Sequence, residues 1–115
     1  MYRIITILSL CIVTVSSGAD PVPFTEAEKL FTLKVQPLLS MKCNGCHGDD
    51  PEDIKGDYSM LTRESLLAGG KDFKNEVLVP GHSGKSFLME AIRWDDPDYE
   101  MPPKENDRLT KEEIA

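Results

Sequence analysis

The chain has 115 residues, with 13 basic and 20 acidic side chains and a formal net charge of −7. A chain of this length holds one small core, which excludes a two-domain enzyme. The acidic balance argues against non-specific nucleic-acid binding, because that requires clustered lysine and arginine. With 40% apolar and 29% charged residues, the composition is that of a globular protein.

Residues 1–19 have the pattern of a secretory signal peptide. Arg3 supplies a positive charge, residues 4–15 are almost continuously apolar, and residues 16–19 are small and uncharged. The alternative is a short membrane anchor, but the apolar run is shorter than the roughly 20 residues of a spanning helix. We therefore expect cleavage after Ala19, export to the periplasm or cell surface, and no membrane span in the mature chain, residues 20–115.

Removal of this segment changes the charge and the cysteine count. Arg3 is its only charged residue, so the mature chain keeps 12 basic and 20 acidic residues and a net charge of −8. Such a charge favours a partner protein with a basic patch, mainly through the association rate. Two cysteines remain, Cys43 and Cys46, in an exported protein where a disulfide would be the default.

The sequence around these cysteines indicates a different chemistry. Cys43 and Cys46 are separated by two residues and followed directly by His47, which is the C-x-x-C-H pattern of c-type haem attachment. Two thiols at this spacing can add to the two vinyl groups of one porphyrin edge, and the next residue can supply the proximal imidazole to the iron. The sequence therefore predicts one covalently attached haem c.

Three other readings of the same motif are weaker. A thioredoxin-like redox pair normally opens a helix within a βαβ pattern, which is absent. Half of a zinc site needs two further ligands at finger-like spacing, and only His82 is available. The third is coincidence, against which the export signal and the adjacent histidine argue.

A second axial ligand is expected from the loop at residues 98–103. Met101 lies there before Pro102 and Pro103, which restrict the backbone, and it follows His47 by 54 residues. His82 is the rival ligand. The remaining methionines of the mature chain fit this role less well, because one is too close to Cys43 and two fit packing positions: Met41, Met60 and Met89.

Helix signals occur along the mature chain. Thr25 and Glu28 form a capping-box pattern, followed at mostly helical spacing by Leu30, Phe31, Val35, Leu38 and Leu39. Pro37 predicts a kink or break just before the haem motif. Residues 48–55 are acidic and turn-like, which predicts a solvated loop.

Three further helices are expected. The first runs from Thr62 to Ala68 and ends at the Gly69–Gly70 pair. The second is capped by Ser83 or Ser86 and extends to Trp94. The third opens with the capping-box pattern at residues 110–113, close to the last residue, which we interpret as a helix cut short. Because strand signals are few, we expect a mostly α fold with long loops.

Together, these motifs resemble the planctomycete-type cytochrome c domain. The resemblance runs from about residue 24 to residue 115, over an ordered set of segments: 31–39, 42–48, 62–70, 79–81, 86–88, 101–103 and 109–114. It implies a small class I cytochrome c-like helical domain, with haem thioethers at Cys43 and Cys46, His47 as proximal ligand and Met101 in the distal position. It also implies a longer C-terminal helix and, in many relatives, downstream domains, so that a longer parent could be an enzyme even if this domain is not.

Single-electron transfer is therefore the expected function, with a redox partner protein and no enzymatic activity in this domain. Two alternatives stay open. One is a haem enzyme or ligand-sensing domain with an open distal site, which His82 would have to serve. The other is a recruitment module of a longer exported protein. Arg93 and Trp94 are candidates for hydrogen bonds to the haem propionates, although Trp94 can equally be a core residue.

Overall fold

The computed structural model describes residues 22–115, and the signal-peptide prediction lies outside this range. The described part is mostly helical, as expected, and contains no β-strand; its one isolated bridge joins Gly70 and Phe73. No helix within residues 22–115 has the length and apolar character needed to cross a membrane.

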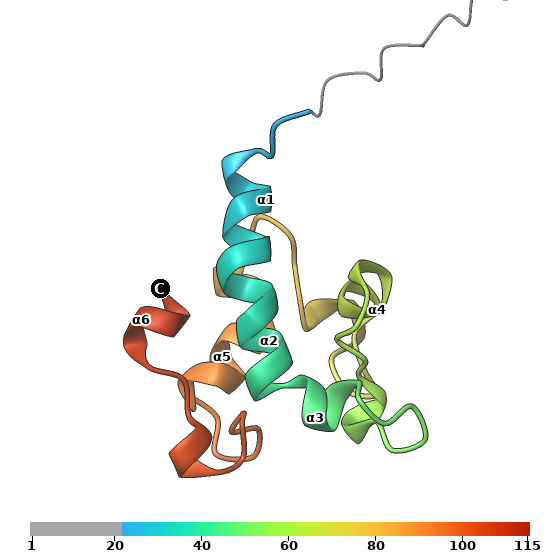
Figure 1. The fold of residues 1–115 in the computed structure, drawn as a ribbon. Coiled ribbons are helices and arrows are strands. Elements are labelled where there is room, and N and C mark those ends of the chain that lie inside the picture. The colour runs from blue at the N-terminus through green and yellow to red at the C-terminus, as the bar shows by residue number, and fades with distance from the viewer. Residues whose placement is uncertain (1–21) are drawn as a thin grey trace, which may run out of the picture.

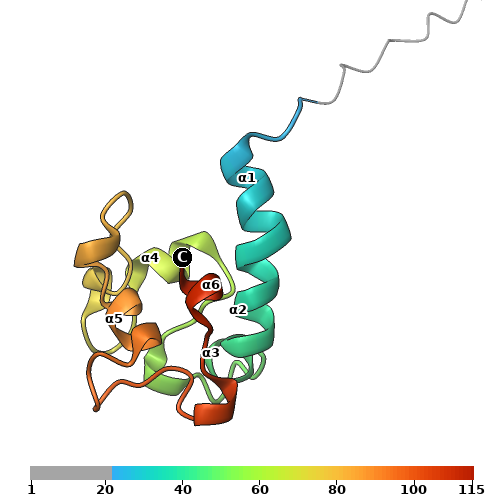
Figure 2. The same cartoon turned by 90° about the vertical axis from the view of Figure 1, so that its left-hand side faces the viewer.

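One long helix forms a side of the molecule (Figures 1 and 2). It consists of α1 (Glu26–Leu30), a π-helical turn (Phe31–Val35) and α2 (Gln36–Lys42). The expected capping box is present, since the Thr25 hydroxyl accepts from the Glu28 backbone and the Glu28 carboxylate accepts from the Thr25 backbone N–H. The N-terminal turns extend beyond the other elements in both views.

The predicted break at Pro37 does not occur. Pro37 lies in the first turn of α2, and the helix continues to Lys42 and ends at Cys43. Directly before the proline, the Gln36 N–H donates to the Phe31 carbonyl five residues earlier, in the wider π pattern. In a π turn, each N–H donates to the carbonyl five residues earlier instead of four. The helix can therefore include Pro37, which has no N–H, without a break.

Much of this helix is exposed on its apolar positions. Leu30 is 59% exposed and Leu33 is 69% exposed, and only Leu38 and Leu39 at the C-terminal end are half-buried. Leu39 packs against the small core, which consists of Tyr58, Met60, Leu66 and Val77. The long helix therefore joins the rest of the molecule mainly through its last turns, next to the C-x-x-C-H motif.

The shorter helices surround the core. They are α3 (Asn44–His47), α4 (Arg63–Ala68), α5 (Phe87–Arg93) and α6 (Lys111–Ile114). Thr62 caps α4 and Gly69 ends it, and Thr110 and Glu113 form the capping box of α6, as predicted. The acidic residues of 49–53 are exposed, which agrees with a solvated loop.

Ser86 holds the N-cap position of α5 but does not cap it with its side chain. Its hydroxyl instead accepts from the Val79 N–H at 3.0 Å and donates to the His82 carbonyl at 3.0 Å. Ser86 is buried, so these bonds satisfy a polar group inside the protein and tie the 79–82 turn to the start of α5.

Gly69 is the position where the backbone leaves least room for a side chain. Its φ is +73°, and a Cβ atom there would lie 1.7 Å from the Lys74 carbonyl oxygen. Gly81 has a similar φ of +76° but has no atom within 4 Å of a Cβ position. Substitution at Gly81 would therefore meet backbone strain alone, whereas substitution at Gly69 would meet both strain and steric overlap.

We expect Gly69→Ala to lower the free energy of unfolding by more than about 2 kcal/mol, because strain and overlap add. Gly81→Ala should cost only about 1 kcal/mol, from strain alone. Urea unfolding of both variants measures the difference. Equal losses would mean that the Lys74 carbonyl moves aside freely and that the close approach does not matter.

Candidate haem site

The turn at α3 carries the residues of the C-x-x-C-H motif. The Cys46 and His47 backbone N–H groups both donate to the Cys43 carbonyl, at 3.1 and 2.9 Å. Cys43 and Cys46 are three residues apart on this turn, so their side chains lie on the same face. Cys43 is half-buried against the core and Cys46 is exposed.

The two cysteines are free thiols, not a disulfide. Burial, with a smaller contribution from nearby Cys46, raises the pKa of the Cys43 thiol, so its neutral form is favoured at neutral pH. Within residues 22–115, no group of three or more His, Cys, Asp and Glu side chains could hold a metal ion, which leaves the half-zinc-site reading without its further ligands.

His47 is held by Tyr58. The ring Nδ1 lies 3.0 Å from the Tyr58 carbonyl oxygen, and the Met60 N–H donates to the His47 carbonyl at 2.8 Å. A carbonyl only accepts, so Nδ1 carries the proton and Nε2 keeps its lone pair. This is the tautomer and the fixed ring orientation that a metal-ligating imidazole needs.

A cavity of about 540 Å³ adjoins α3, and its lining is mostly apolar. Such a volume is in the range of cofactor pockets, about 300–1,000 Å³. Cys46 and His47 line it from α3, Cys43 lines it from the N-cap of α3, and Met101 lines it from the loop after α5. The apolar lining includes Tyr58, Met60, Val77, Leu88, Ile92 and Pro102. Two thiols, an imidazole and a thioether around an apolar cavity are a donor set that fits haem c.

The candidate distal ligands differ in whether they line the cavity. Met101 and Met60 line the cavity, but Met60 belongs to the buried core and its backbone bonds to His47. His82 is exposed and is not among the cavity-lining residues, and Met41 is 74% exposed. Met89 lines a different hollow. We expected it to pack in the core, and it is half-buried.

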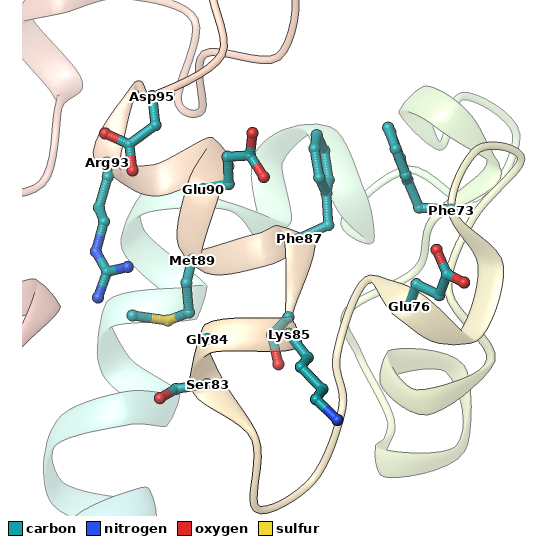
Figure 3. Close-up of a pocket in the computed structure, with 11 residues that line it drawn as sticks. Phe73, Glu76, Ser83, Gly84, Lys85, Phe87, Met89, Glu90, Arg93 and Asp95 are labelled. Atoms are coloured by element: carbon teal, nitrogen blue, oxygen red, sulfur yellow. The ribbon is translucent and has the colours of Figure 1, made fainter.

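This second hollow, of about 500 Å³, lies over α5 and carries mixed charges (Figure 3). Arg93 lines it, and Arg93 is not among the residues that line the main cavity. The Trp94 indole N–H donates to the Met101 carbonyl at 3.3 Å. An indole has one donor, so the structure gives Trp94 a partner other than a propionate, and it places Arg93 on another surface.

An aromatic cluster separates the two cavities. Phe73 and Phe87 are stacked with ring centroids 3.7 Å apart, and both line the second hollow (Figure 3). Both also line the main cavity. The Tyr99 ring meets each of them edge-on at 5.1 Å. Sequence reasoning missed this wall, because its members come from three separate segments. Tyr58 was missed for a similar reason, since its contribution to His47 is a backbone carbonyl.

Tyr58 gives a test of this arrangement. Its hydroxyl donates to the Leu66 carbonyl at 3.3 Å, and burial is the main cause that raises its pKa to about 12. We expect Tyr58→Phe to lower the unfolding free energy at pH 7 by about 1 kcal/mol. Tyr99→Phe is the control, because the described residues offer its hydroxyl no hydrogen-bond partner.

The same variant changes the pH dependence. An unfolded tyrosine ionises near pH 10 and folded Tyr58 near 12, so wild-type stability should fall between about pH 10 and 12. Tyr58→Phe should lack that part of the fall. Urea unfolding across this range measures it, and an identical decline in both proteins would assign the titration to another group.

Comparison with known proteins agrees with the site. The family model described as Planctomycete cytochrome C matches residues 43–105, more than half of the chain and a range that contains both Cys43 and Met101. Neither the curated proteins nor the solved structures gave a match. The family match and the strand-free helical architecture of residues 22–115 confirm the prediction of a mostly α, cytochrome c-like fold. The chain belongs to the planctomycete cytochrome c family.

Proposed function

We propose that this chain is an exported c-type cytochrome domain that carries one covalently attached haem and transfers single electrons. The observation that carries the proposal is the cavity of about 540 Å³, into which one helical turn and one loop bring two thiols, an imidazole and a thioether. Membership in the cytochrome c family supports the same conclusion.

Each residue then has a defined task. Cys43 and Cys46 would hold the haem through thioether bonds, and His47 Nε2 and the Met101 sulfur would hold the iron. When bound, haem supplies an iron that accepts and releases one electron. The Tyr58 carbonyl keeps His47 in the ligating tautomer, and the apolar lining excludes water from the site.

Ligation by histidine and methionine favours electron transfer over catalysis. If His47 and Met101 both held the iron, a substrate would not reach it, and the thioether would raise the reduction potential relative to two nitrogen ligands. The alternative of an open-site enzyme or sensor needs a polar acid–base group beside the distal face. His82 was its candidate from sequence, and His82 is exposed and does not line the cavity.

Export is part of this proposal and rests on the residue pattern of 1–19. Covalent haem attachment to C-x-x-C-H fits an extracytoplasmic protein, and the described residues 22–115 add no membrane-spanning helix. The proposed mature domain therefore begins near residue 20, and further domains of a longer parent chain are compatible with it.

Met101→Ala tests the ligation. In haem-loaded protein, we expect loss of the far-red sulfur-to-iron absorption band, a lower reduction potential and an iron that binds added imidazole. Met89→Ala is the matched control, since Met89 lines the other hollow, and it should change none of the three (Figure 3).

Two results would contradict the ligation. A far-red band that persists in Met101→Ala would point to Met60 as the sulfur ligand. Covalent haem without the band in the wild type would exclude a methionine ligand and favour an open site or His82. Failure of the protein to attach haem at Cys43 and Cys46, read by mass spectrometry, would overturn the proposed function itself.

For the partner, we propose a protein with a basic patch. The net charge of −8 and the exposed acidic loop beside the motif support this proposal, and the loop carries Asp49, Asp50, Glu52 and Asp53. The lysine, arginine, aspartate and glutamate side chains that line the cavity have the opposite charge balance, three basic and two acidic: Lys42, Lys55, Lys104, Asp72 and Asp107. Lys55 is itself paired with Asp53 at 2.7 Å.

Electron-transfer rates with small redox complexes can show whether the net acidic charge or the lysines that line the cavity dominate the electrostatic field. If the net acidic charge does, the electron-transfer rate with a cationic ruthenium ammine falls as salt rises from 10 to 150 mM, roughly a fourfold change in Debye length. The rate with ferricyanide, an anion, should rise over the same range. The opposite pair of trends would mean that the lysines lining the cavity dominate the field and that the partner surface is acidic.

A further inference from the structure

The backbone of Met101 is fixed on both sides by the end of α5. Its N–H donates to the Ala91 carbonyl at 3.1 Å, and its carbonyl accepts from the Trp94 indole at 3.3 Å. Ala91 is 5% exposed, so the first of these contacts is anchored in the interior. A residue in a loop outside any helix is thus held by two hydrogen bonds to one helix end.

The position of Trp94 follows from how α5 ends. Trp94 is the C-cap residue and has left-handed backbone angles, φ 63° and ψ 38°. Its N–H donates to the Ala91 and Glu90 carbonyls and so closes the helix. A left-handed angle is uncommon for a bulky aromatic residue, so the surrounding contacts must hold this conformation.

Arg108 provides one of these contacts. Its guanidinium carbon lies 4.8 Å from the centre of the Trp94 ring, and its Nη2 donates to the Arg93 carbonyl at 2.9 Å. A guanidinium over an indole face is attractive, and the hydrogen bond fixes the guanidinium relative to the helix end. The chain after the Met101 loop therefore returns to α5 and covers the indole.

We propose that Trp94, covered by Arg108, is the positioning residue that keeps Met101 at the haem cavity. This proposal rests on the proposed function, in which Met101 is the distal ligand. The indole N–H removes a rotational freedom of the loop at the residue that carries the sulfur, so less order is lost when the sulfur binds. Without this bond, the loop samples positions in which the distal site is open.

The test replaces only the donor. Trp94 is the single tryptophan of the chain, and β-(3-benzothienyl)alanine has nearly the same shape with sulfur in place of the N–H. In haem-loaded protein, we expect this replacement to increase the apparent affinity for imidazole, which competes with Met101, by about 2- to 10-fold, the range for one neutral hydrogen bond. The far-red band should also be lost at lower imidazole concentration.

Three variants complete the design. Trp94→Phe removes the donor with natural amino acids and should change imidazole affinity in the same direction. Arg93→Gln is the control, because the Arg93 side chain lines the second hollow (Figure 3) and the substitution keeps the backbone carbonyl to which Arg108 donates. It should leave the affinity unchanged. Arg108→Leu should have a smaller effect than Trp94→Phe, and the two effects should not add, because both act through the same contact.

The outcomes distinguish failure of the Trp94 positioning role from failure of Met101 ligation itself. If the wild type shows the far-red band and the benzothienyl protein binds imidazole within twofold of it, the positioning role of Trp94 is wrong while Met101 ligation stands. A lower unfolding midpoint with unchanged imidazole affinity also overturns the inference, because it indicates a structural role only. If the wild type carries haem but lacks the band, Met101 ligation fails, and the inference fails with it.

Discussion

The hydrogen bond between His47 Nδ1 and the Tyr58 carbonyl connects the attachment motif to the core. The Met60 N–H closes the connection by donating to the His47 carbonyl, and Tyr58 and Met60 are two of the four core residues. These bonds fix the orientation of α3 and leave Nε2 of the imidazole free for a ligand. The rest of the site is built around a histidine whose tautomer and direction are already set.

The core itself is small, and the cavity beside it is comparable to a cofactor pocket. None of the described side chains is completely buried, and the core residues Tyr58, Met60 and Val77 also line the cavity. A domain of this size buries a limited apolar area of its own. We infer that the bound group would complete the packing, so haem attachment and stable folding would be coupled through the same residues.

The two sides of the site are held in different ways. His47 belongs to a helical turn that is hydrogen-bonded to the core, whereas Met101 belongs to a loop that is fastened to the end of α5. A ligand on a loop depends on distant anchors, and here these are Ala91, Trp94 and Arg108. In the proposed haem site, exchange of ligands would therefore take place on the Met101 side.

The sequence by itself determined where α1, α4 and α6 begin, the C-x-x-C-H motif and the family, because capping boxes and C-x-x-C-H depend on residues within one turn. It also pointed to Met101 through its proline-rich surroundings, although it left His82 open. The path of the chain through Pro37, the partner of the Trp94 indole and the contact of Tyr58 with His47 were decided only by the tertiary structure. The Trp94 and Tyr58 contacts join residues 7 and 11 positions apart, and the path through Pro37 rearranges backbone pairing. No local pattern specifies which carbonyl a given donor will meet.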